Sequence, residues 1–528
     1  MPSMQLSLPG RACSEERAIV VGAGAGGLAA ALSLAAAGIA VTVVERRDGA
    51  GGKLRQARIG DSMIDIGPTV FTMRWVFDEL FHAAGLEFSD FLALDPAGVL
   101  ARHAWVAGGE LDLYSSLEQS AAAIGRFAGA ADARGYLAFA ARARAIYDTL
   151  EGPFMRRACA SPVDLIRAAG LHRLADLWRI TPFTSLWRAL GRHFRDPRLR
   201  QLFGRYATYC GSSPFAAPAT LMLVAHVERE GVWLVRGGMQ RLVDALCRAC
   251  RQRGVEFRFG ATVDAVETRH GRASGVRLAD GDSVAATRVV LNADSAAVSA
   301  GSFGMPAARA VPRIAAAQRS LSAMTWAFRA RSEGFALEHH NVFFSSDYRR
   351  EFAEIFAHAR MPQEPTVYLC AHGSGDAEQS LFCLINAPPD GDTHTYSAAE
   401  IDTCARRMTT VLNRCGLRLT RTASATVATT PTDFERLFPN TGGALYGPAS
   451  HGFMASFRRP QARTHLPGLY LAGGSVHPGP GVPMAVLSGR LAAASVLADL
   501  RSTAPWRPAA IAGGTSTHRA TTASPGSP

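Results

Sequence analysis

The clearest pattern of apolar and polar positions lies close to the N-terminus. Residues 18–45 contain Val and Ile clusters at both ends, and between them lie a Gly-rich segment and then an Ala- and Leu-rich segment. Short runs of β-branched residues predict strands, and the longer Ala/Leu run predicts a helix. The segment therefore predicts a strand, a glycine turn, a helix and a second strand, which is the start of an α/β fold with a parallel sheet.

The pattern changes character along the rest of the chain. Residues 115–229 are helical in pattern with few strand signals, and residues 320–455 mix strands with helices. Residues 469–500 predict a strand, a glycine-rich loop and a long helix. Both ends, residues 1–16 and 503–528, are rich in Pro, Ser, Thr, Ala and Gly, and we expect them to be disordered. A chain of 528 residues is too long for one ordinary core, so two or three domains are expected.

The glycine turn after the first predicted strand has the spacing of a dinucleotide-binding turn. Gly22 permits the tight turn, Gly24 lets a pyrophosphate approach the backbone, and Gly27 lets helix and strand pack closely. Glu45 ends the second strand, where a carboxylate can accept hydrogen bonds from ribose hydroxyls. We expect the turn to bind the dinucleotide through Gly22, Ala23, Gly24, Gly26 and Gly27.

The residues after Glu45 distinguish a flavin dinucleotide from a nicotinamide dinucleotide. A second glycine pair with a basic residue comes next, followed by a Gly-Pro-Thr sequence. In a plain NAD-binding domain, the third strand would follow a crossover helix instead. The stretch resembles the flavin-binding extension of the amine oxidase and phytoene desaturase superfamily. This resemblance implies cofactor contacts from Arg46, Gly51, Gly52, Lys53, Gly67, Pro68 and Thr69.

A second motif of this kind lies near the C-terminus. Residues 469–474 form a predicted strand that runs into a glycine pair, and a helix begins after the following loop. Such an element suits a long cofactor whose flavin lies far from its adenine. It resembles the C-terminal signature of bacterial-type carotenoid desaturases, in which the loop and the helix start contact the flavin and the ribityl chain. The residues that match are Gly473, Gly474, Val482, Pro483 and Met484.

The resemblance to the carotenoid and phytoene desaturase family covers roughly residues 17–500. It implies FAD as the cofactor, with Val263 on the adenine and Asp294 near the cofactor. Residues 67–79 look most like the hydroxyneurosporene (methoxyneurosporene) desaturase branch, the 1-hydroxycarotenoid 3,4-desaturases. The implied reaction introduces a carbon–carbon double bond into an acyclic 1-hydroxy or 1-methoxy carotenoid by hydride transfer to flavin N5. The electrons would then pass to oxygen or a quinone.

Other functions on the same fold remain open. A phytoene desaturase, a carotene isomerase or a retinol saturase would act on similar lipids. An FAD-dependent amine oxidase would need an aromatic cage at the flavin and a polar substrate site. A protein of the GDP-dissociation-inhibitor type would bind prenyl lipids without redox chemistry, but the retained glycine turn and flavin loop argue against it.

The resemblance also implies the architecture. We expect an α/β fold with a Rossmann-type FAD-binding domain of the two-dinucleotide-binding-domain, amine oxidase-like class, interleaved with a substrate domain and a helical membrane-associating region. The FAD-binding parts are expected at residues 17–114, 230–300 and 456–502. The helical substrate- and membrane-associating region is expected at residues 115–229, and the substrate domain at residues 301–455.

Charge bears on the partners of the protein. The formal net charge of +12 comes almost wholly from arginine, because Lys53 is the single lysine. The arginines are scattered rather than clustered with aromatic residues, which argues against nucleic acid and suits an anionic membrane surface. Outside residues 18–44, whose glycines mark the turn, we find no apolar run long enough to span a bilayer. We therefore expect a cytoplasmic protein bound peripherally (monotopically) to the inner membrane.

No side chain can be named as the catalytic group, and no metal site is predicted. Cys247 and Cys250 form a CxxC, but they lie on an amphipathic helical pattern and have no histidine pair beside them, so helix packing is the better interpretation. His477 lies in the flavin loop, where a packing role and a functional role fit equally well. Five aromatic residues are candidates for the walls of a polyene tunnel, although aromatic residues at such positions more often belong to an ordinary core: Phe71, Trp75, Phe183, Trp187 and Phe203.

Overall fold

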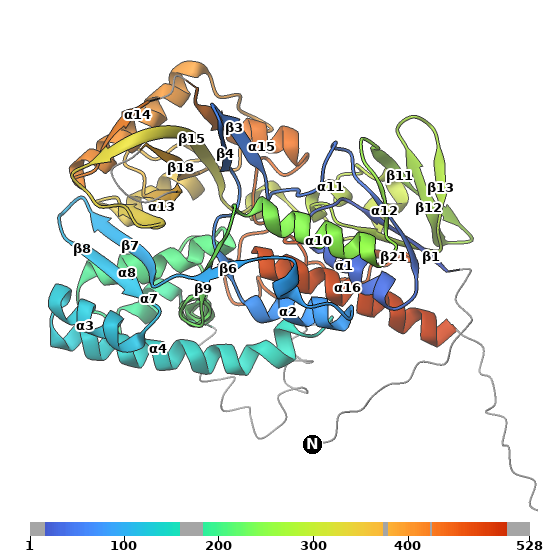
Figure 1. Cartoon of the computed structure of the whole chain (residues 1–528), viewed down its shortest axis with the longest axis horizontal. Coiled ribbons are helices and arrows are strands. Elements are labelled where there is room, and N and C mark those ends of the chain that lie inside the picture. Colours follow the sequence, from blue (N-terminus) through green and yellow to red (C-terminus); the bar gives the residue numbers. More distant parts are fainter. Residues whose placement is uncertain (1–15, 159–182, 373–377, 423–424, 504–528) are drawn as a thin grey trace, which may run out of the picture.

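The computed structural model describes residues 16–158, 183–372, 378–422 and 425–503 (Figure 1). A parallel sheet that contains β1 lies to the right in this view, and a larger sheet that contains β15 and β18 lies to the upper left. The helices of the segment 117–229 lie below the larger sheet. The two sheets and the helical segment together form the site described below.

The parallel sheet has five strands in the order β10-β2-β1-β14-β21. Its central strand, β1 (Arg17–Val21), is buried at every position after Arg17, as expected where both faces of a parallel sheet are covered. The remaining strands are β2 (Ala40–Val44), β10 (Glu256–Arg258), β14 (Arg288–Leu291) and β21 (Leu469–Leu471). Because all pairings are parallel, the carboxyl ends of strands far apart in the sequence meet at one edge.

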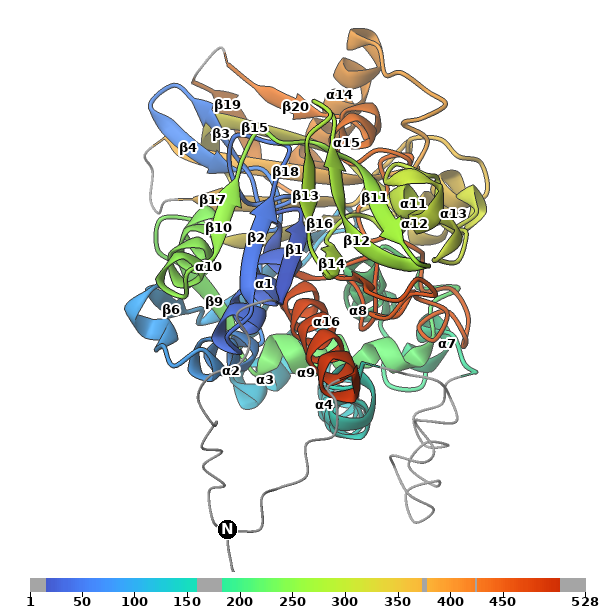
Figure 2. The ribbon, with the colours of Figure 1, turned by 90° about the vertical axis from the view of Figure 1, so that its right-hand side faces the viewer.

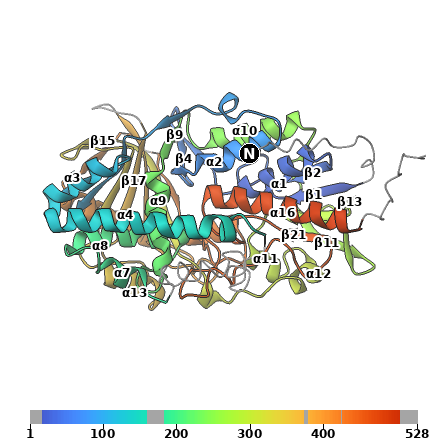
Figure 3. The same cartoon turned by 90° about the horizontal axis from the view of Figure 1, so that it is seen from below.

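Three helices pack close to this sheet: α1 (Ala25–Ala36), α10 (Gln240–Gln252) and α16 (Val482–Thr503). Helices α1 and α16 run side by side, as Figures 2 and 3 both show. Their backbones approach closely at Gly489, which has no side chain. A Cβ on this residue would lie only 2.1 Å from the carbonyl oxygen of Gly26. On α10, Cys247 and Cys250 are buried and carry free thiols, so the packing interpretation of the CxxC is confirmed.

Helix α16 is also the one helix in the described part of the chain that is long and apolar enough to cross a membrane, over Val482–Ser502. By length and composition this helix corrects the expectation that no apolar run outside residues 18–44 could span a bilayer, although Arg490 interrupts it. Of this window, 61% is buried inside the structure. Packing against α1 accounts for the apolar character of the helix, as in the core helix of a soluble fold.

The second sheet has eight strands in the order β19-β15-β18-β17-β16-β7-β8, with β20 paired to β15. Its strands are β7 (Val99–Trp105), β8 (Glu110–Tyr114), β15 (Ser322–Glu333), β16 (His340–Phe344), β17 (Val367–His372), β18 (Gln379–Ala387), β19 (Arg418–Arg421) and β20 (Val427–Thr429). Strands β7 and β8 fall within residues 17–114, which we expected to be FAD-binding, yet they belong to this sheet: β7 pairs with β16, and β8 pairs with β7. A local pattern predicts a strand but not which sheet it joins.

Three smaller sheets and the remaining helices complete the fold. The small sheets contain β3 (Gln56–Ile59) with β4 (Ser62–Asp65), β5 (Phe71–Thr72) with β6 (Leu94–Pro96) and β9 (Val232–Val235), and β11 (Val263–Arg269) with β12 (Arg272–Leu278) and β13 (Ser283–Ala285). The α-helices are α2 (Arg74–Ala83), α3 (Leu117–Ala128), α4 (Ala130–Leu150), α7 (Leu186–Leu190), α8 (Pro197–Gly204), α9 (Leu223–Arg229), α11 (Ser295–Ser299), α12 (Gly304–Arg309), α13 (Tyr348–Phe356), α14 (Ala398–Arg414) and α15 (Pro431–Leu437). Shorter helical turns are η1 (Phe88–Asp90), η2 (Glu151–Met155), η4 (Arg205–Cys210), η5 (Ala219–Met222) and η6 (Ala316–Gln318).

Candidate functional site

A cavity of about 960 Å³ connects the carboxyl ends of the parallel sheet with the eight-stranded sheet and the helical segment. This volume lies at the upper end of the range for small-molecule sites. Strands β1 and β2, the loops after β14 and β21, and the first turn of α16 line one end. Side chains of η4, η5, α9, β17 and β18 line the other end.

The turn between β1 and α1 is open toward the cavity. Gly22 has a φ of +99°, and a Cβ there would lie 2.7 Å from the carbonyl oxygen of Asn292. Gly24 is the N-cap of α1 and makes no side-chain capping bond, so the first N–H groups of the helix face the cavity without a side-chain acceptor. Free N–H groups and the helix dipole at such a terminus attract a phosphate.

Glu45 is fixed at the end of β2. Its Oε2 accepts a hydrogen bond from the backbone N–H of Ala23 at 2.8 Å, and its Oε1 accepts one from Arg47 N at 3.0 Å. The side chain is buried at the cavity wall, beside the turn. A carboxylate has about four acceptor positions, so two remain for the hydroxyl groups of a ligand.

The second glycine pair touches the first turn. Gly51 has a φ of +138° and donates its N–H to the carbonyl oxygen of Ala23 at 2.9 Å. Gly67 lies so close to the segment around Lys53 that a Cβ would be 2.0 Å from the carbonyl oxygen of Lys53. The bond from Gly51 to Ala23 holds the stretch after β2 against the dinucleotide turn. At the turn itself, the glycine backbone faces the cavity.

Lys53 is the one lysine of the chain and lies in the cavity wall. Its Nζ donates a hydrogen bond to the carbonyl oxygen of Leu445 at 2.5 Å and lies 5.2 Å from the ring centroid of Phe438. Burial lowers the pKa of Lys53 from its ordinary value, and the charge of Asp294 acts in the opposite direction. An anionic ligand in the cavity would favour the charged lysine in the same way.

Asn292 joins the two ends of the chain at this site. It follows β14, and its Nδ2 donates a hydrogen bond to the carbonyl oxygen of Ala472 at 3.1 Å. Cβ atoms on Gly24 and Gly473 would lie 2.8 Å and 2.7 Å from its side-chain amide. Asp294, two residues further on, was predicted from the sequence, whereas Asn292 was not. Its position directly after a buried strand beside β1 was the available signal.

The predicted cofactor residues therefore come together. Of them, all except Ala23 and Gly27 line the cavity, and these two lie behind the turn that does. The wall formed by glycine backbone, the open helix terminus of α1 and the carboxylate of Glu45 fit a dinucleotide. The structure thus offers the set of groups that the cofactor prediction requires.

The opposite end of the cavity carries a buried polar cluster in apolar surroundings. Arg205 and Tyr209 both line the cavity, and their pKa values are raised, together with that of Tyr206. For the two tyrosines burial is the main cause, and for Arg205 the neighbouring Tyr209 and Glu228 outweigh burial, which acts in the opposite direction. Tyr206 Oη donates to Glu228 Oε2 at 2.6 Å, and Tyr209 Oη donates to Glu228 Oε1.

A hydrogen-bonded chain links the predicted flavin segment to the eight-stranded sheet. Thr69 Oγ1 lies 2.6 Å from Tyr368 Oη, which in turn lies 2.8 Å from His340 Nδ1. Thr69 and Tyr368 line the cavity, whereas His340 is buried behind them. Burial lowers the pKa of His340 far below its ordinary value, so this ring is neutral.

The tunnel prediction is wrong for four of the five aromatic residues. Phe71 and Phe203 are buried in separate apolar cores, Trp187 packs against Phe215, and Trp75 lies under the guanidinium of Arg156. None of these four predicted residues lines the cavity; of the five, Phe183 alone does. Large aromatic side chains fill cores by default, and a sequence does not distinguish that use from a cavity wall.

His477 does not line the cavity. Its Nε2 donates to the carbonyl oxygens of Phe154 and Arg157 at 2.9 Å and 3.0 Å, and its ring packs against the ring of Phe154. Of the two roles left open for this histidine, the structure supports packing.

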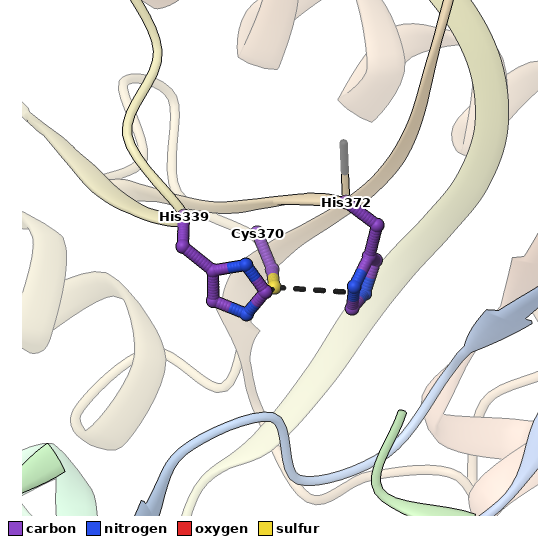
Figure 4. Close-up of side chains that lie close together, drawn as sticks. All are labelled: His339, Cys370 and His372. Carbon is purple, nitrogen blue, oxygen red and sulfur yellow. Dashed lines mark hydrogen bonds between the residues drawn. The ribbon is translucent and has the colours of Figure 1, made fainter. Parts of the chain in front are cut away.

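One group among the described residues could hold a metal ion (Figure 4). The Sγ of Cys370 lies 3.6 Å from Nε2 of His339 and 3.7 Å from Nε2 of His372. Burial raises the pKa of the Cys370 thiol above its ordinary value and lowers the pKa of His339 to about 4. Cys370 and His372 lie on β17, and His339 lies in the loop before β16. The group was not predicted from the sequence, because it forms only when these two segments come together.

Comparisons with known proteins agree with this geometry. The family model of flavin containing amine oxidoreductases matches residues 25–497. The hydroxyneurosporene desaturase of Rubrivivax gelatinosus is 51% identical over 96% of this chain and 98% of its own length. That of Cereibacter sphaeroides is 44% identical over 92% of this chain and 98% of its own length.

Solved structures show the same fold at low sequence identity. The cyclohexylamine oxidase from Brevibacterium oxydans superposes with a TM-score of 0.56 at 17% identity, covering 92% of this chain and 99% of its own. An oxidoreductase from Methanosarcina mazei gives a TM-score of 0.58 at 15% identity, covering 91% and 100%. The predicted amine oxidase-like α/β fold is confirmed. The chain therefore belongs to the flavin containing amine oxidoreductase family and, within it, to the carotenoid desaturases that include the hydroxyneurosporene desaturases.

Proposed function

We propose that the chain is an FAD-dependent desaturase that introduces a carbon–carbon double bond into an acyclic carotenoid with a hydroxyl or methoxy group on C1. The observation that carries this proposal is the single cavity that joins a dinucleotide turn to an apolar chamber. Relatives that share 51%, 44% and 41% identity with the chain are named hydroxyneurosporene desaturases, which supports the choice of substrate.

In this proposal FAD lies along the glycine-lined end. The N-terminus of α1 would hold the pyrophosphate, Glu45 the ribose hydroxyls, and Val263 the adenine. Lys53, Thr69 and the first turn of α16 would surround the flavin, which supplies the hydride acceptor when bound. The isoalloxazine would therefore face the apolar chamber, where the polyene lies.

The side chains of the chamber bind the polyene and exclude water. Leu221, Val224, Val227, Phe382 and Leu384 form apolar walls. Among the described residues, the carboxylates in the cavity wall are Glu45 and Asp294, and both belong to the cofactor end. Charge that develops on a long polyene is delocalised, so loss of the second hydrogen as a proton requires no strong base, and we assign no catalytic residue.

The substrate source in this proposal is a membrane. Each buried methylene is worth about 0.8 kcal/mol, so a long hydrocarbon does not pass through water. Phe183 lines the cavity, is 69% exposed and packs against Phe453 with ring centroids 4.5 Å apart. It would contact lipid at the cavity mouth, with the enzyme bound peripherally to the cytoplasmic face of the inner membrane. A quinone dissolved in that membrane, or oxygen, would accept the electrons.

The experiment is a conversion assay with three substrates. The purified holoprotein receives liposomes that contain a 1-hydroxylated acyclic carotenoid, its hydrocarbon analogue or phytoene, and products are followed by chromatography and absorption. A red shift with the hydroxylated substrate supports the proposal. Conversion of phytoene in preference would identify a phytoene desaturase, and a geometric isomer without oxidation would identify an isomerase. A colourless protein that cannot be loaded with FAD would point to the non-redox lipid-binding type.

Membrane binding is tested separately by liposome flotation at low and physiological salt. Binding that weakens with salt but persists supports electrostatic attraction combined with apolar insertion. Phe183→Ser should weaken flotation at both salt concentrations, whereas the exposed Met305, which does not line the cavity, serves as the control in Met305→Ser. A wild-type protein that ignores liposomes at both concentrations would exclude a membrane as the substrate source.

A further inference from the structure

Arg205 is an unusual residue for the wall of a hydrocarbon chamber. It lies on η4, its side chain is only 10% exposed, and it lines the cavity. A buried charge is costly unless it is paired and its donors are satisfied. Arg205 must therefore either be held by a strong partner within the protein or face a ligand that completes its hydrogen bonds.

The partners within the described protein do not complete the hydrogen bonds of the guanidinium. The NH2 nitrogen lies 3.8 Å from Oε1 of Glu228, which is beyond hydrogen-bond distance, and the NH1 nitrogen donates to Tyr209 Oη at 3.3 Å. The Nε atom is buried and has no hydrogen-bond partner in the described structure. A guanidinium carries five N–H donors, so Arg205 retains donor capacity toward the cavity.

Tyr209 complements this donor. Its hydroxyl donates to Oε1 of Glu228 and accepts from Arg205 NH1, so one oxygen lone pair remains for an incoming hydrogen-bond donor. Tyr206 donates to the same carboxylate from the other side but does not line the cavity. The cavity wall thus presents a charged donor, Arg205, next to a hydroxyl that can accept, Tyr209.

The pair lies within electrostatic reach of a residue that is hydrogen-bonded to the segment expected at the flavin. Tyr368, which lines the cavity and is hydrogen-bonded to Thr69, is close enough for the charges of Arg205 and Tyr209 to act on its pKa, although burial is the main cause of its rise. Thr69 belongs to the Gly-Pro-Thr segment expected at the flavin. A polar group held by Arg205 would therefore sit a short distance along the substrate from the reacting carbons.

We propose that Arg205 and Tyr209 form a subsite for the oxygen on C1 of the carotenoid, and that this subsite selects the substrate and sets which bond faces the flavin. The inference rests on the proposed function. A hydroxyl oxygen accepts from the guanidinium while its hydrogen is donated to Tyr209; a methoxy oxygen accepts from Arg205 alone. If the new bond is C3–C4, the oxygen-bearing carbon lies two carbon–carbon bonds from C3, so the proposal requires that the flavin reach the substrate close to this subsite.

The subsite discriminates through the cost of an unpaired donor. A hydrocarbon terminus in the same place would leave unpaired those guanidinium donors that Tyr209 does not accept. Sites built to pair a substrate hydroxyl reject the analogue that lacks it much more strongly than apolar walls reject an added hydroxyl. The polar cluster therefore favours the oxygenated substrate over phytoene and other hydrocarbons.

The test compares kcat/KM for the 1-hydroxylated carotenoid with that for its hydrocarbon analogue in wild type and three variants. Arg205→Met should lower kcat/KM for the hydroxylated substrate about 100-fold, and Tyr209→Phe about tenfold, while the value for the hydrocarbon stays constant or rises. Tyr206→Phe is the matched control, because it removes the equivalent hydroxyl from Glu228 outside the cavity. It should leave the ratio of the two substrates at the wild-type value.

Several results would overturn the subsite. Equal losses on both substrates in Arg205→Met and Tyr209→Phe would show a structural role, as would equal shifts of the ratio in Tyr209→Phe and Tyr206→Phe. FAD content and Tm are measured for every variant. If Arg205→Met loses FAD, the comparison of the substrate ratio in Tyr209→Phe with that in Tyr206→Phe still tests the subsite. A wild-type enzyme that desaturates the hydrocarbon equally well would refute the subsite but keep the desaturase, whereas one that converts neither substrate would refute both.

Discussion

The Cβ position of Gly27 lies 2.1 Å from the carbonyl oxygen of Gly22, so the first turn of α1 is packed directly onto the end of β1. Gly22 itself is enclosed by the carbonyl oxygen of Asn292, which directly follows the neighbouring strand β14. The obstacle at both glycines is backbone, which cannot rotate away as a side chain can. The dinucleotide turn is therefore held in one shape by the pairing of β1 with β14.

Gly27→Ala should prevent formation of the FAD site. The added methyl group cannot be accommodated without moving α1 from β1, and overpacking of this kind costs about 3 kcal/mol. We expect a protein of lower Tm that purifies without yellow colour. Gly49→Ala is the control, because nothing lies within 4 Å of its Cβ position, and it should retain FAD. A yellow Gly27→Ala variant with the Tm of the wild type would contradict the placement of the turn.

Glu45→Gln should weaken FAD binding about tenfold, although the shape is kept. Both carboxylate oxygens accept backbone N–H groups, so the amide group of Gln would place its own donor against one of them. The loss therefore includes local reorganisation besides the weaker contact with the ribose. Titration of the apoprotein with FAD measures the change, with the exposed Asp48→Asn as the control. Equal affinities in Glu45→Gln and wild type would remove Glu45 from the site.

The sequence was sufficient where function depends on backbone shape. Glycine spacing encodes a turn directly, and this is why Gly22, Gly24 and Gly473 were placed correctly beside one cavity. Asn292 and Arg205 were missed, because their roles depend on which strands and helices come together across long stretches of chain. Nothing in the sequence around Arg205 distinguishes it from the many exposed arginines of the chain.

The tunnel residues failed for a related reason. The pattern around Phe71 and Phe203 correctly indicated buried aromatic residues, and both are buried. Burial in a core and exposure to an internal cavity produce the same apolar sequence signal. Only the three-dimensional arrangement separates them.

The cluster of His339, Cys370 and His372 should contain no metal. A metal ion requires the thiolate, whereas burial raises the pKa of the Cys370 thiol, so binding would have to displace a proton in a buried site. The sulfur can instead donate its proton to one of the two neutral rings. We expect substoichiometric zinc by elemental analysis and an unchanged Tm after dialysis against a chelator. One equivalent of zinc in the wild type that disappears in His372→Ala would establish a metal site and refute this prediction.

Two glutamates on α13 should respond to pH in opposite directions. Glu351 is buried, and its Oε2 accepts hydrogen bonds from Ser345 at 2.8 Å and Thr366 at 2.7 Å, while its Oε1 has no partner among the described residues. Burial raises the pKa of Glu351 to about 7. The folded protein therefore keeps this proton at pH values where the unfolded chain has released it.

Glu354, three residues further along the helix, has the opposite environment. Burial alone would raise its pKa, but the backbone N–H of Gln363 and the guanidinium groups of Arg350 and Arg360 lower it overall. Its Oε2 accepts from Gln363 at 2.8 Å, and its Oε1 accepts from Arg360 at 3.0 Å. Its contribution to stability is present above its ordinary pKa and is lost as the pH falls through the lowered value.

The expected pH dependence follows from the protons bound. Between the ordinary glutamate pKa of 4.5 and about 7, the folded state binds one more proton at Glu351 than the unfolded state, so stability from this group falls as the pH rises, by about 3 kcal/mol in total. Glu351→Gln should remove this slope and raise Tm at pH 8. The matched variant Glu354→Gln should keep the slope between pH 5 and 7 and lower Tm at neutral pH, because it breaks the contacts with Arg350 and Arg360. Thermal unfolding of the holoprotein at pH 5, 6, 7 and 8 measures both, and a slope that persists in Glu351→Gln would show that another group carries it.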